Sequence, residues 1–264
     1  MMKTFVINLD RAPERLAKIS AALDGCGLPF QRVTAVDART MPDAERARRV
    51  CGEGYWGWMT PGEVACFLSH RMCWQMLVDS DAPHALVLED DVVLGRDAAA
   101  VLGRCDWVPA EADVVKLETN FDPVIVGRQE IVVVPGRSVR RLHSSHYGTG
   151  AYIVSRTAAR RLLPLTERFI DAVDETLFST RSAISRSLGK YQLSPAACVQ
   201  PHKLSATIPV HDPGGSIEGR EDKHMRRDPL VRRLVADVRN DVRKAGNAVA
   251  CLAGTRRRIE VPFQ

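Results

Sequence analysis

Short apolar runs that alternate with helix-like segments are the feature that most restricts the fold of this chain. Each run has the length of a buried strand, and turn residues or helix-start signals separate it from the next. Such alternation predicts an α/β protein with a mixed or parallel central sheet that is flanked by helices on both faces. The strands are expected over residues 5–7, 30–36, 85–88, 114–117, 131–134, 152–154 and 197–200.

Three helices have recognisable starts in the sequence. Thr60 is followed by proline at the first helical position and by Glu63 at the third, which completes a capping box. Ser155 and Asp10 are residue types whose side-chain oxygens cap helices. The helices are expected over residues 13–25, 61–79 and 156–163, with Asp10, Thr60 and Ser155 as their respective caps.

Composition suits a globular protein with a core of its own. The chain has 264 residues, of which 45% are hydrophobic and 26% charged, as in one large domain or one domain with an appendage. No run reaches the roughly eighteen apolar residues of a membrane span, and the first residues lead directly into a strand, so a cytoplasmic protein is expected. The seven cysteines are dispersed and lack zinc-site spacing, so reduced thiols are expected.

Positive charge is concentrated towards the end of the chain. Residues 219–264 contain twelve Lys or Arg and six Asp or Glu, whereas the remaining residues together are slightly acidic. A body without basic excess and with only 6% aromatic residues argues against nucleic-acid binding.

Apolar residues recur with helical period between 231 and 249, which predicts a basic amphipathic helix. This helix either makes peripheral contact with an anionic membrane or docks on the body through its apolar stripe. The chain is therefore divided into a domain over residues 1–210 and, over 211–264, a flexible segment followed by the basic helix.

Three adjacent carboxylates, Glu89, Asp90 and Asp91, end the apolar run at 85–88. Like charges this close raise one another's pKa unless a cation lies among them. Carboxylate ligands favour Mg²⁺ or Mn²⁺, and the carboxyl end of a strand is where α/β proteins usually hold nucleotides and their phosphates. The alternative interpretation is a solvated acidic turn.

Five short motifs occur in a fixed order along the chain. They read FVINLDR with PERL (5–16), AVDA (35–38), GEVACFLSH (62–70), LEDDV (88–92) and GAYIVS (150–155). In this order they resemble glycosyltransferase family 25, which contains bacterial lipooligosaccharide galactosyltransferases and is similar to the collagen galactosyltransferases of animals. The resemblance spans residues 3–207.

The resemblance implies a GT-A-like nucleotide-sugar-binding fold, a divalent metal, and transfer of a hexose with inversion at the anomeric carbon. The expected donor is UDP-galactose, and the expected acceptor is a lipopolysaccharide, a lipooligosaccharide or another glycan.

The resemblance assigns the acidic triplet to a metal that neutralises the diphosphate leaving group. Asp91 is the expected ligand of Mn²⁺ or Mg²⁺, and Glu89 is expected to reach the metal or the ribose, directly or through water. Asp90 is counted among the donor-binding residues but is expected to point the other way, because side chains alternate along an extended backbone. His202 is the expected third ligand, and His211 is the alternative.

Donor binding is expected from polar residues near the first strand ends. Asn8, Arg11 and Arg15 can reach a base, ribose or diphosphate there, although Arg11 and Arg15 equally suit pairing with neighbouring acids. Asp37 either accepts hydrogen bonds from the base or ribose or is a turn residue. His70 is expected to line the nucleotide-sugar pocket, and the alternative is a structural hydrogen bond within its helix.

An inverting transfer also needs a base that takes the proton of the acceptor hydroxyl. Asp174 is the expected base and Glu175 a weaker substitute, unless Asp174 caps a helix. His143 and His146, near two glycines, are expected to contact the donor sugar or the acceptor. Two other functions stay open: a metal-dependent phosphohydrolase that uses the same carboxylates, and a catalytically silent binding module with a glycosyltransferase-like fold.

Overall fold

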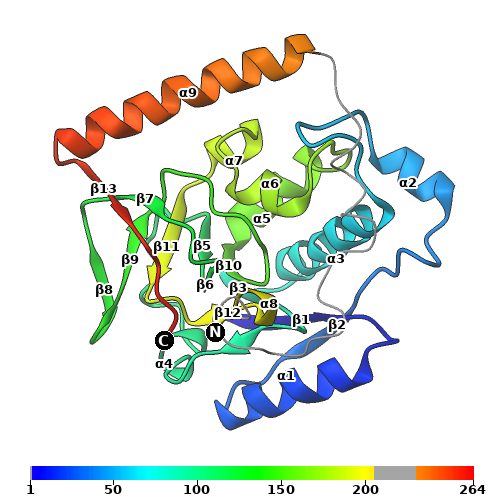
Figure 1. The fold of residues 1–264 in the computed structure, drawn as a ribbon. Coiled ribbons are helices and arrows are strands. Elements are labelled where there is room, and N and C mark those ends of the chain that lie inside the picture. Colours follow the sequence, from blue (N-terminus) through cyan, green and yellow to red (C-terminus); the bar gives the residue numbers. More distant parts are fainter. Residues whose placement is uncertain (1, 205–229) are drawn as a thin grey trace.

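The computed structural model describes residues 2–204 and 230–264. An eight-stranded sheet forms the centre, with the strand order β2-β1-β3-β10-β5-β11-β9-β8 (Figure 1). β1 runs parallel to β2 and β3, whereas β10 is antiparallel to both of its neighbours. The predicted mixed sheet is therefore confirmed, although β9 and β11 were not predicted. In sheet order the strands are Gln31–Thr34, Lys3–Asn8, His84–Glu89, Ala151–Ser155, Val114–Lys116, Lys190–Ser194, Arg137–Arg141 and Ile131–Val134.

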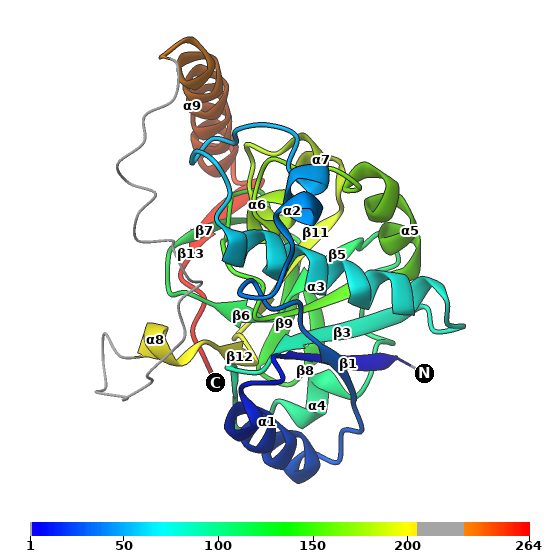
Figure 2. The same ribbon diagram turned by 90° about the vertical axis from the view of Figure 1, so that its right-hand side faces the viewer.

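Helices cover both faces of this sheet, as predicted. α3 and α5 pack on one face, and α1 and α4 pack on the other (Figure 2). The strands alternate to serve both layers: Phe5 and Ile7 of β1 join the core beneath α3, while Val6 between them joins the core beneath α1. The helices are α1 (Pro13–Gly25), α2 (Asp43–Arg49), α3 (Pro61–Val78), α4 (Ala99–Leu102), α5 (Arg156–Leu165), α6 (Val173–Phe178), α7 (Ala183–Ser187), α8 (Pro201–Leu204) and α9 (Leu230–Leu252).

Two of the three predicted helix caps are confirmed. The Glu63 N–H donates to Thr60 Oγ1 at 3.2 Å, and the Thr60 N–H donates to Glu63 Oε2 at 2.9 Å, which completes the capping box. Ser155 Oγ accepts from the N–H of Ala158. The prediction for Asp10 is wrong, because α1 follows Ala12 without a side-chain cap and the Asp10 carboxylate pairs with Arg32 instead.

The last residues of the chain belong to the same folded unit as the first. β13 (Arg256–Ile259) pairs antiparallel with β7 (Val124–Gly127). Val261 is fully buried, and its carbonyl oxygen accepts from Thr119 Oγ1 at 2.7 Å. The predicted division at residue 210 is therefore wrong for residues 256–264, because their backbone and side chains complete the body of the protein. A third, small sheet contains β4 (Val93–Leu94), β12 (Cys198–Val199) and β6 (Glu118–Thr119).

α9 turns its polar side towards the body and its apolar side away from it. Asn240 and Asn247 are buried, and Arg243 donates to the carbonyl oxygen of Thr180 at 2.5 Å. With 100° per residue, the opposite side of the helix carries its exposed apolar stripe. This stripe consists of Val238, Val242, Val249 and Leu252, which are 58%, 67%, 65% and 89% exposed. Docking through the apolar stripe, one of the two predicted alternatives, is thus wrong for this part of α9.

The segment predicted as flexible, with His211 in it, lies outside the described residues. Within the residues that are described, no helix combines the length and the apolar character needed to cross a membrane.

Candidate functional site

The acidic triplet lies at the carboxyl end of β3, in the middle of the central sheet. Glu89 ends this strand and is in register with Ile7 of β1, so that Asn8 follows at the same edge. On the other side the Glu89 N–H donates to the Gly150 carbonyl oxygen at 2.9 Å, at the start of β10. Three separate motifs of the sequence therefore meet at one edge of the sheet.

The first two carboxylates of the triplet point in different directions, as the alternation along the strand predicted. Glu89 faces α3, where its Oε1 lies 3.2 Å from His70 Nε2 and accepts from Thr149 Oγ1 at 2.9 Å. Asp90 faces α1, where it accepts from Asn8 Nδ2 at 2.6 Å and pairs with Arg15 at 3.6 Å. Glu89 therefore belongs to the layer of α3 and Asp90 to the layer of α1.

Asp91 is the least satisfied carboxylate of the triplet. Its Oδ1 is buried, and no hydrogen-bond partner for it exists among the described residues. Burial, together with the negative charges of Glu89 and Asp90, raises the pKa of Asp91 to about 8. A buried carboxylate oxygen without a donor is the arrangement that a hard divalent cation would satisfy, so the residues present fit Mn²⁺ or Mg²⁺.

The predicted third metal ligand, His202, lies two residues after a side chain that contacts the cluster. His202 is exposed on α8, which begins directly after Gln200, and Gln200 Nε2 donates to Glu89 Oε2 at 3.4 Å. The structure thus brings the start of α8 to the acidic cluster. That His202 binds the metal stays a prediction.

A chain of hydrogen bonds behind Glu89 orients its carboxylate. Trp74 Nε1 donates to the Tyr152 hydroxyl at 2.9 Å, and this hydroxyl lies 3.0 Å from His70 Nδ1. If the Tyr152 O–H donates to Nδ1, the proton of the neutral imidazole is on Nε2 and points at Glu89. Burial alone would raise the pKa of Glu89, but its interactions with His70, Thr149 and Lys116 together outweigh burial and lower the pKa. His70 is fully buried, so it stands behind the carboxylate rather than in an open pocket.

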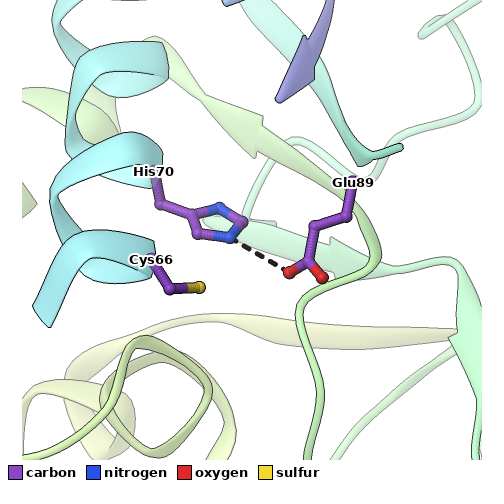
Figure 3. A group of neighbouring side chains, drawn as sticks. All are labelled: Cys66, His70 and Glu89. Carbon is purple, nitrogen blue, oxygen red and sulfur yellow. Dashed lines mark hydrogen bonds and ion pairs between the residues drawn. The ribbon is translucent and has the colours of Figure 1, made fainter. Parts of the chain in front are cut away.

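Cys66 joins His70 and Glu89 in a second group of candidate metal ligands (Figure 3). Cys66 and His70 lie one turn apart on α3, and one ligand atom from each of the three residues lies within 4.8 Å of the others. A thiolate and an imidazole beside one carboxylate suit Zn²⁺ better than Mg²⁺ or Mn²⁺. Glu89 belongs both to the acidic triplet and to the group with Cys66 and His70. Its carboxylate is therefore the centre of the candidate metal site whichever of these two groups binds the ion.

The predicted donor-binding residues are already engaged with one another. Asn8 Nδ2 donates to both Asp90 and the Ala12 carbonyl oxygen, and Arg11 pairs with Asp37 at 2.9 Å. Both arginines therefore make the acid pairs that formed the alternative interpretation, since Arg15 pairs with Asp90.

Asp37 has the hydrogen bonds of a turn residue, because its Oδ1 accepts from the N–H of Arg39 at 2.9 Å. This bond and the Arg11 guanidinium together hold the pKa of Asp37 below its usual value despite slight desolvation. Asp37 also lines a cleft of about 590 Å³ next to α2 and α3, which contains none of the triplet carboxylates. Donor binding by Asp37 stays a prediction.

Asp174 lies next to the acidic cluster, although it is far from it in the sequence. α6 has Ala172 as its N-cap, so the alternative in which Asp174 caps this helix is wrong. The Gly148 N–H donates to Asp174 Oδ2 at 3.2 Å, and the following residue, Thr149, donates to Glu89. Two consecutive residues therefore connect the expected base with the expected metal site. Burial and the charge of Asp174 raise the pKa of the neighbouring Glu175 to about 7.

A buried ion pair that the sequence did not reveal supports this connection. Lys116 Nζ lies 2.9 Å from Glu118 Oε1 and donates to the Gly148 carbonyl oxygen at 2.6 Å, while Glu118 accepts from the Gly150 N–H at 2.9 Å. Both charged side chains are buried. Their only signal in the sequence is a pair of charges within the apolar run at 114–118. Gly148 and Gly150 pack on Glu118, since a Cβ at Gly148 would lie 2.9 Å from Glu118 Oε1 and a Cβ at Gly150 2.8 Å from Glu118 Oε2.

The two histidines expected near the sugar are not both available to it. His146 is buried between Gln192 Oε1, at 2.6 Å, and Asn120 Oδ1, at 2.8 Å. Burial lowers its pKa to about 3, and burial likewise lowers the pKa of His143 to about 4. His146 thus has a structural role, whereas sugar contact by His143 stays a prediction.

Comparison with known proteins identifies the enzyme class. A family model described as glycosyltransferase family 25 (LPS biosynthesis protein) matches residues 1–177. The chain is 32% identical over 254 residues to the lacto-N-neotetraose biosynthesis glycosyltransferase LgtE of Neisseria meningitidis serogroup B, covering 93% of this chain and 90% of the relative. It is 34% identical over 208 residues to LgtB of Neisseria gonorrhoeae, covering 75% and 74%. It is 28% identical over 199 residues to the lipooligosaccharide biosynthesis protein lex-1 of Haemophilus influenzae, covering 72% and 66%.

These similarities, on an α/β fold with a carboxylate cluster at its strand ends, define a glycosyltransferase. The chain belongs to glycosyltransferase family 25, as its five ordered motifs predicted.

Proposed function

We propose that the protein is an inverting galactosyltransferase that depends on Mn²⁺ or Mg²⁺ and transfers galactose from UDP-galactose to the glycan of a lipooligosaccharide. The names of the relatives, which refer to lacto-N-neotetraose and lipooligosaccharide biosynthesis, support this class of acceptor. One structural observation carries the proposal: Asp91 has a buried oxygen with no hydrogen-bond partner in the described part of the chain, and it lies in a cluster that residues 148 and 149 connect to Asp174.

Asp91 and Glu89 would hold the metal, with His202 as a third ligand. The metal would supply positive charge for the diphosphate as its bond to the sugar breaks. The hydrogen bonds from His70 and Thr149 keep Glu89 ionised and fixed in orientation, which is what a ligand or an electrostatic partner needs. The donor would bind near the neighbouring strand end, next to a group of polar residues that contact one another: Asn8, Arg11, Arg15, Asp37 and Asp90.

Asp174 is suited to take up the proton of the acceptor. In the proposed step the acceptor oxygen attacks the anomeric carbon from the face opposite the diphosphate. The bond from that carbon to the diphosphate breaks with its electron pair, and the hydroxyl proton passes to Asp174. Backbone N–H groups of Gly148 and Glu175 donate to the two Asp174 oxygens at 3.2 and 2.9 Å, which fixes the orientation of the carboxylate that would act as the base.

Donor and metal binding can be tested before any acceptor is known. The unfolding temperature of the full chain is measured with a panel of nucleotide sugars, each with Mn²⁺ and with EDTA. Selective stabilisation by UDP-galactose that requires Mn²⁺ is expected. Equal behaviour of all nucleotide sugars would contradict the donor assignment, and equal stabilisation with EDTA would contradict the metal. The anomeric configuration of the transferred galactose, measured by NMR on a glycan product, tests inversion.

We also propose that α9 contacts an anionic membrane with its exposed apolar stripe. Five basic residues lie on α9 against two acidic ones, and Arg239 and Lys244, both exposed, flank the stripe. An apolar stripe bordered by cations suits the interface of an anionic bilayer, and a lipid-linked acceptor would be found there.

Co-sedimentation of the full chain with vesicles tests this contact. Vesicles of phosphatidylcholine mixed with phosphatidylglycerol are expected to bind the protein more strongly than pure phosphatidylcholine vesicles. The double substitution Val242→Ser and Val249→Ser is expected to abolish the difference, whereas Val132→Ser, at an exposed valine of β8, leaves it intact. Undiminished binding of the double variant would refute a role for α9.

A further inference from the structure

Two exposed tryptophans and a half-buried tyrosine lie on one short segment that contacts the helix of the proposed base. Tyr55, Trp56 and Trp58 lie on the segment 54–58, here called the aromatic loop. Trp56 and Trp58 are 45% and 55% exposed, whereas Trp74 and Trp107, the other two tryptophans of the chain, are buried. Large aromatic rings left together in water mark a surface that binds something.

The aromatic loop is fixed on the segment that leads into α6. The Cys51 N–H donates to the Phe169 carbonyl oxygen at 3.2 Å. Gly54 packs so closely that a Cβ there would lie 2.5 Å from the Ile170 carbonyl oxygen. Gly54 and Gly57 exchange backbone hydrogen bonds of 3.2 and 3.1 Å, which closes a tight turn around Tyr55 and Trp56.

Side-chain contacts also fix the orientation of the Tyr55 and Trp56 rings. Trp56 Nε1 donates to Glu175 Oε1 at 2.6 Å, and Glu175 directly follows Asp174. The Arg181 guanidinium lies 4.0 Å from the ring centre of Tyr55, and the Tyr55 and Trp56 rings meet edge to face with centres 4.9 Å apart. An indole held by its N–H and by its neighbours loses little freedom when a ligand binds, so the loop is pre-organised.

We propose that the aromatic loop is the acceptor subsite, where a neutral pyranose ring of the glycan stacks on the exposed indoles. This inference rests on the proposed function, because it identifies the acceptor side by its closeness to Asp174. One face of a pyranose presents C–H groups with partial positive charge, which the negative face of an aromatic ring attracts.

The position of the loop favours the acceptor over the donor. The donor's diphosphate belongs to the strand ends of β1 and β3, where the carboxylates and Arg15 lie. The aromatic loop contacts Glu175 on α6 instead, and the acceptor hydroxyl must reach Asp174 on that helix. A nucleoside base, the other ligand that stacks on indoles, would place the loop on the donor side and is distinguished by the test below.

Steady-state kinetics with varied acceptor and varied UDP-galactose test the assignment. Trp58→Ala is expected to raise the KM for the acceptor about tenfold, with the KM for the donor within about twofold of the original. Trp58→Phe, which keeps a flat ring, restores most of the acceptor affinity, whereas Trp58→Leu, which keeps only apolar surface, does not. Leu165→Ala, at an exposed leucine of α5, is the control and changes neither KM.

Two results would overturn the assignment: a raised KM for the donor with an unchanged KM for the acceptor, or no change in either. Failure of the proposed function is seen separately, because the unchanged protein would then bind no nucleotide sugar in the thermal assay. In that case titration of galactose-terminated and glucose-terminated oligosaccharides, followed by isothermal titration calorimetry, decides the question. Binding that Trp58→Phe retains and Trp58→Leu loses upholds a sugar subsite, and no binding, or equal binding by the two variants, refutes it.

Discussion

Replacing Asp91 with asparagine should make the metal-free protein more stable and at the same time remove its response to metal. Asparagine has nearly the same size and shape but no charge. The pKa of Asp91 is about 8 in the folded chain against 3.8 for the unperturbed group, because of its burial and the charges of Glu89 and Asp90. The proton is therefore bound more tightly in the folded state, and stability falls as pH rises between these two values.

The size of the effect follows from this difference in pKa. At pH 7 the unfolded chain has released the proton while the folded chain retains it, which costs the folded state about 4 kcal/mol relative to a group with an unperturbed pKa. Asp91→Asn removes this cost, so its gain in unfolding free energy should grow from pH 4 to pH 8. Saturating Mn²⁺ acts the other way: at a hundred times its Kd it should stabilise the original protein by about 3 kcal/mol and leave the variant unchanged.

Urea unfolding at several pH values, with Mn²⁺ and with EDTA, measures both effects. Asp106→Asn is the matched control, because Asp106 is an exposed carboxylate paired with Arg104, and it should alter neither curve. The reasoning is refuted if Asp91→Asn is less stable than the original protein in EDTA and is still stabilised by Mn²⁺.

Three further predictions concern neighbouring parts of the site. Asp174→Asn should lower kcat by roughly 100- to 10 000-fold without changing the Mn²⁺-dependent thermal shift by the donor; retained turnover would exclude Asp174 as the base. Lys116→Met leaves the buried Glu118 unpaired and should cost about 3 kcal/mol in urea unfolding, whereas Arg104→Met at an exposed pair should have no measurable effect; equal losses would show that the buried pair is not special. Tryptophan fluorescence should titrate near pH 7, as Glu175 ionises and accepts more strongly from Trp56 at higher pH; a midpoint that persists in Glu175→Gln would assign the transition to another group.

Much of the fold could be predicted because its signals are local. The capping box at Thr60 depends on residues three apart, and the strand at 85–88 on its own apolar side chains. β9 and β11 were missed because their sequences, RSVRR and KYQLS, are polar. Several of their polar groups have partners elsewhere in the chain, such as Arg128, whose carbonyl oxygen accepts from Arg140, and Glu118, whose carbonyl oxygen accepts from Gln192.

The site could be predicted in part, because some of its signals are also local in the sequence. A triplet that ends a strand predicts a carboxylate cluster at the sheet edge, and its alternation predicts that Glu89 and Asp90 diverge. The hydrogen bond between Tyr152 and His70 and the one from Thr149 to Glu89 could not be predicted, because they depend on how β10 lies against β3. The predicted boundary at 210 failed because β13 contains three consecutive arginines and resembles a solvated tail, whereas its backbone is paired with β7.

Two consecutive residues, Thr180 and Arg181, contact α9 and the aromatic loop, respectively. Thr180 receives the hydrogen bond from Arg243, and Arg181 stacks on Tyr55. If α9 rests on a bilayer, the distance from the lipid surface to the indoles is set by the protein and cannot vary much. Such an enzyme would select its acceptor by length. A glycan whose terminal sugar lies at that distance from the membrane would be extended, and a glycan that is shorter or longer by a few sugars would not be a substrate. Acceptor choice would then depend on the length of the lipid-linked chain as well as on the identity of its last residue.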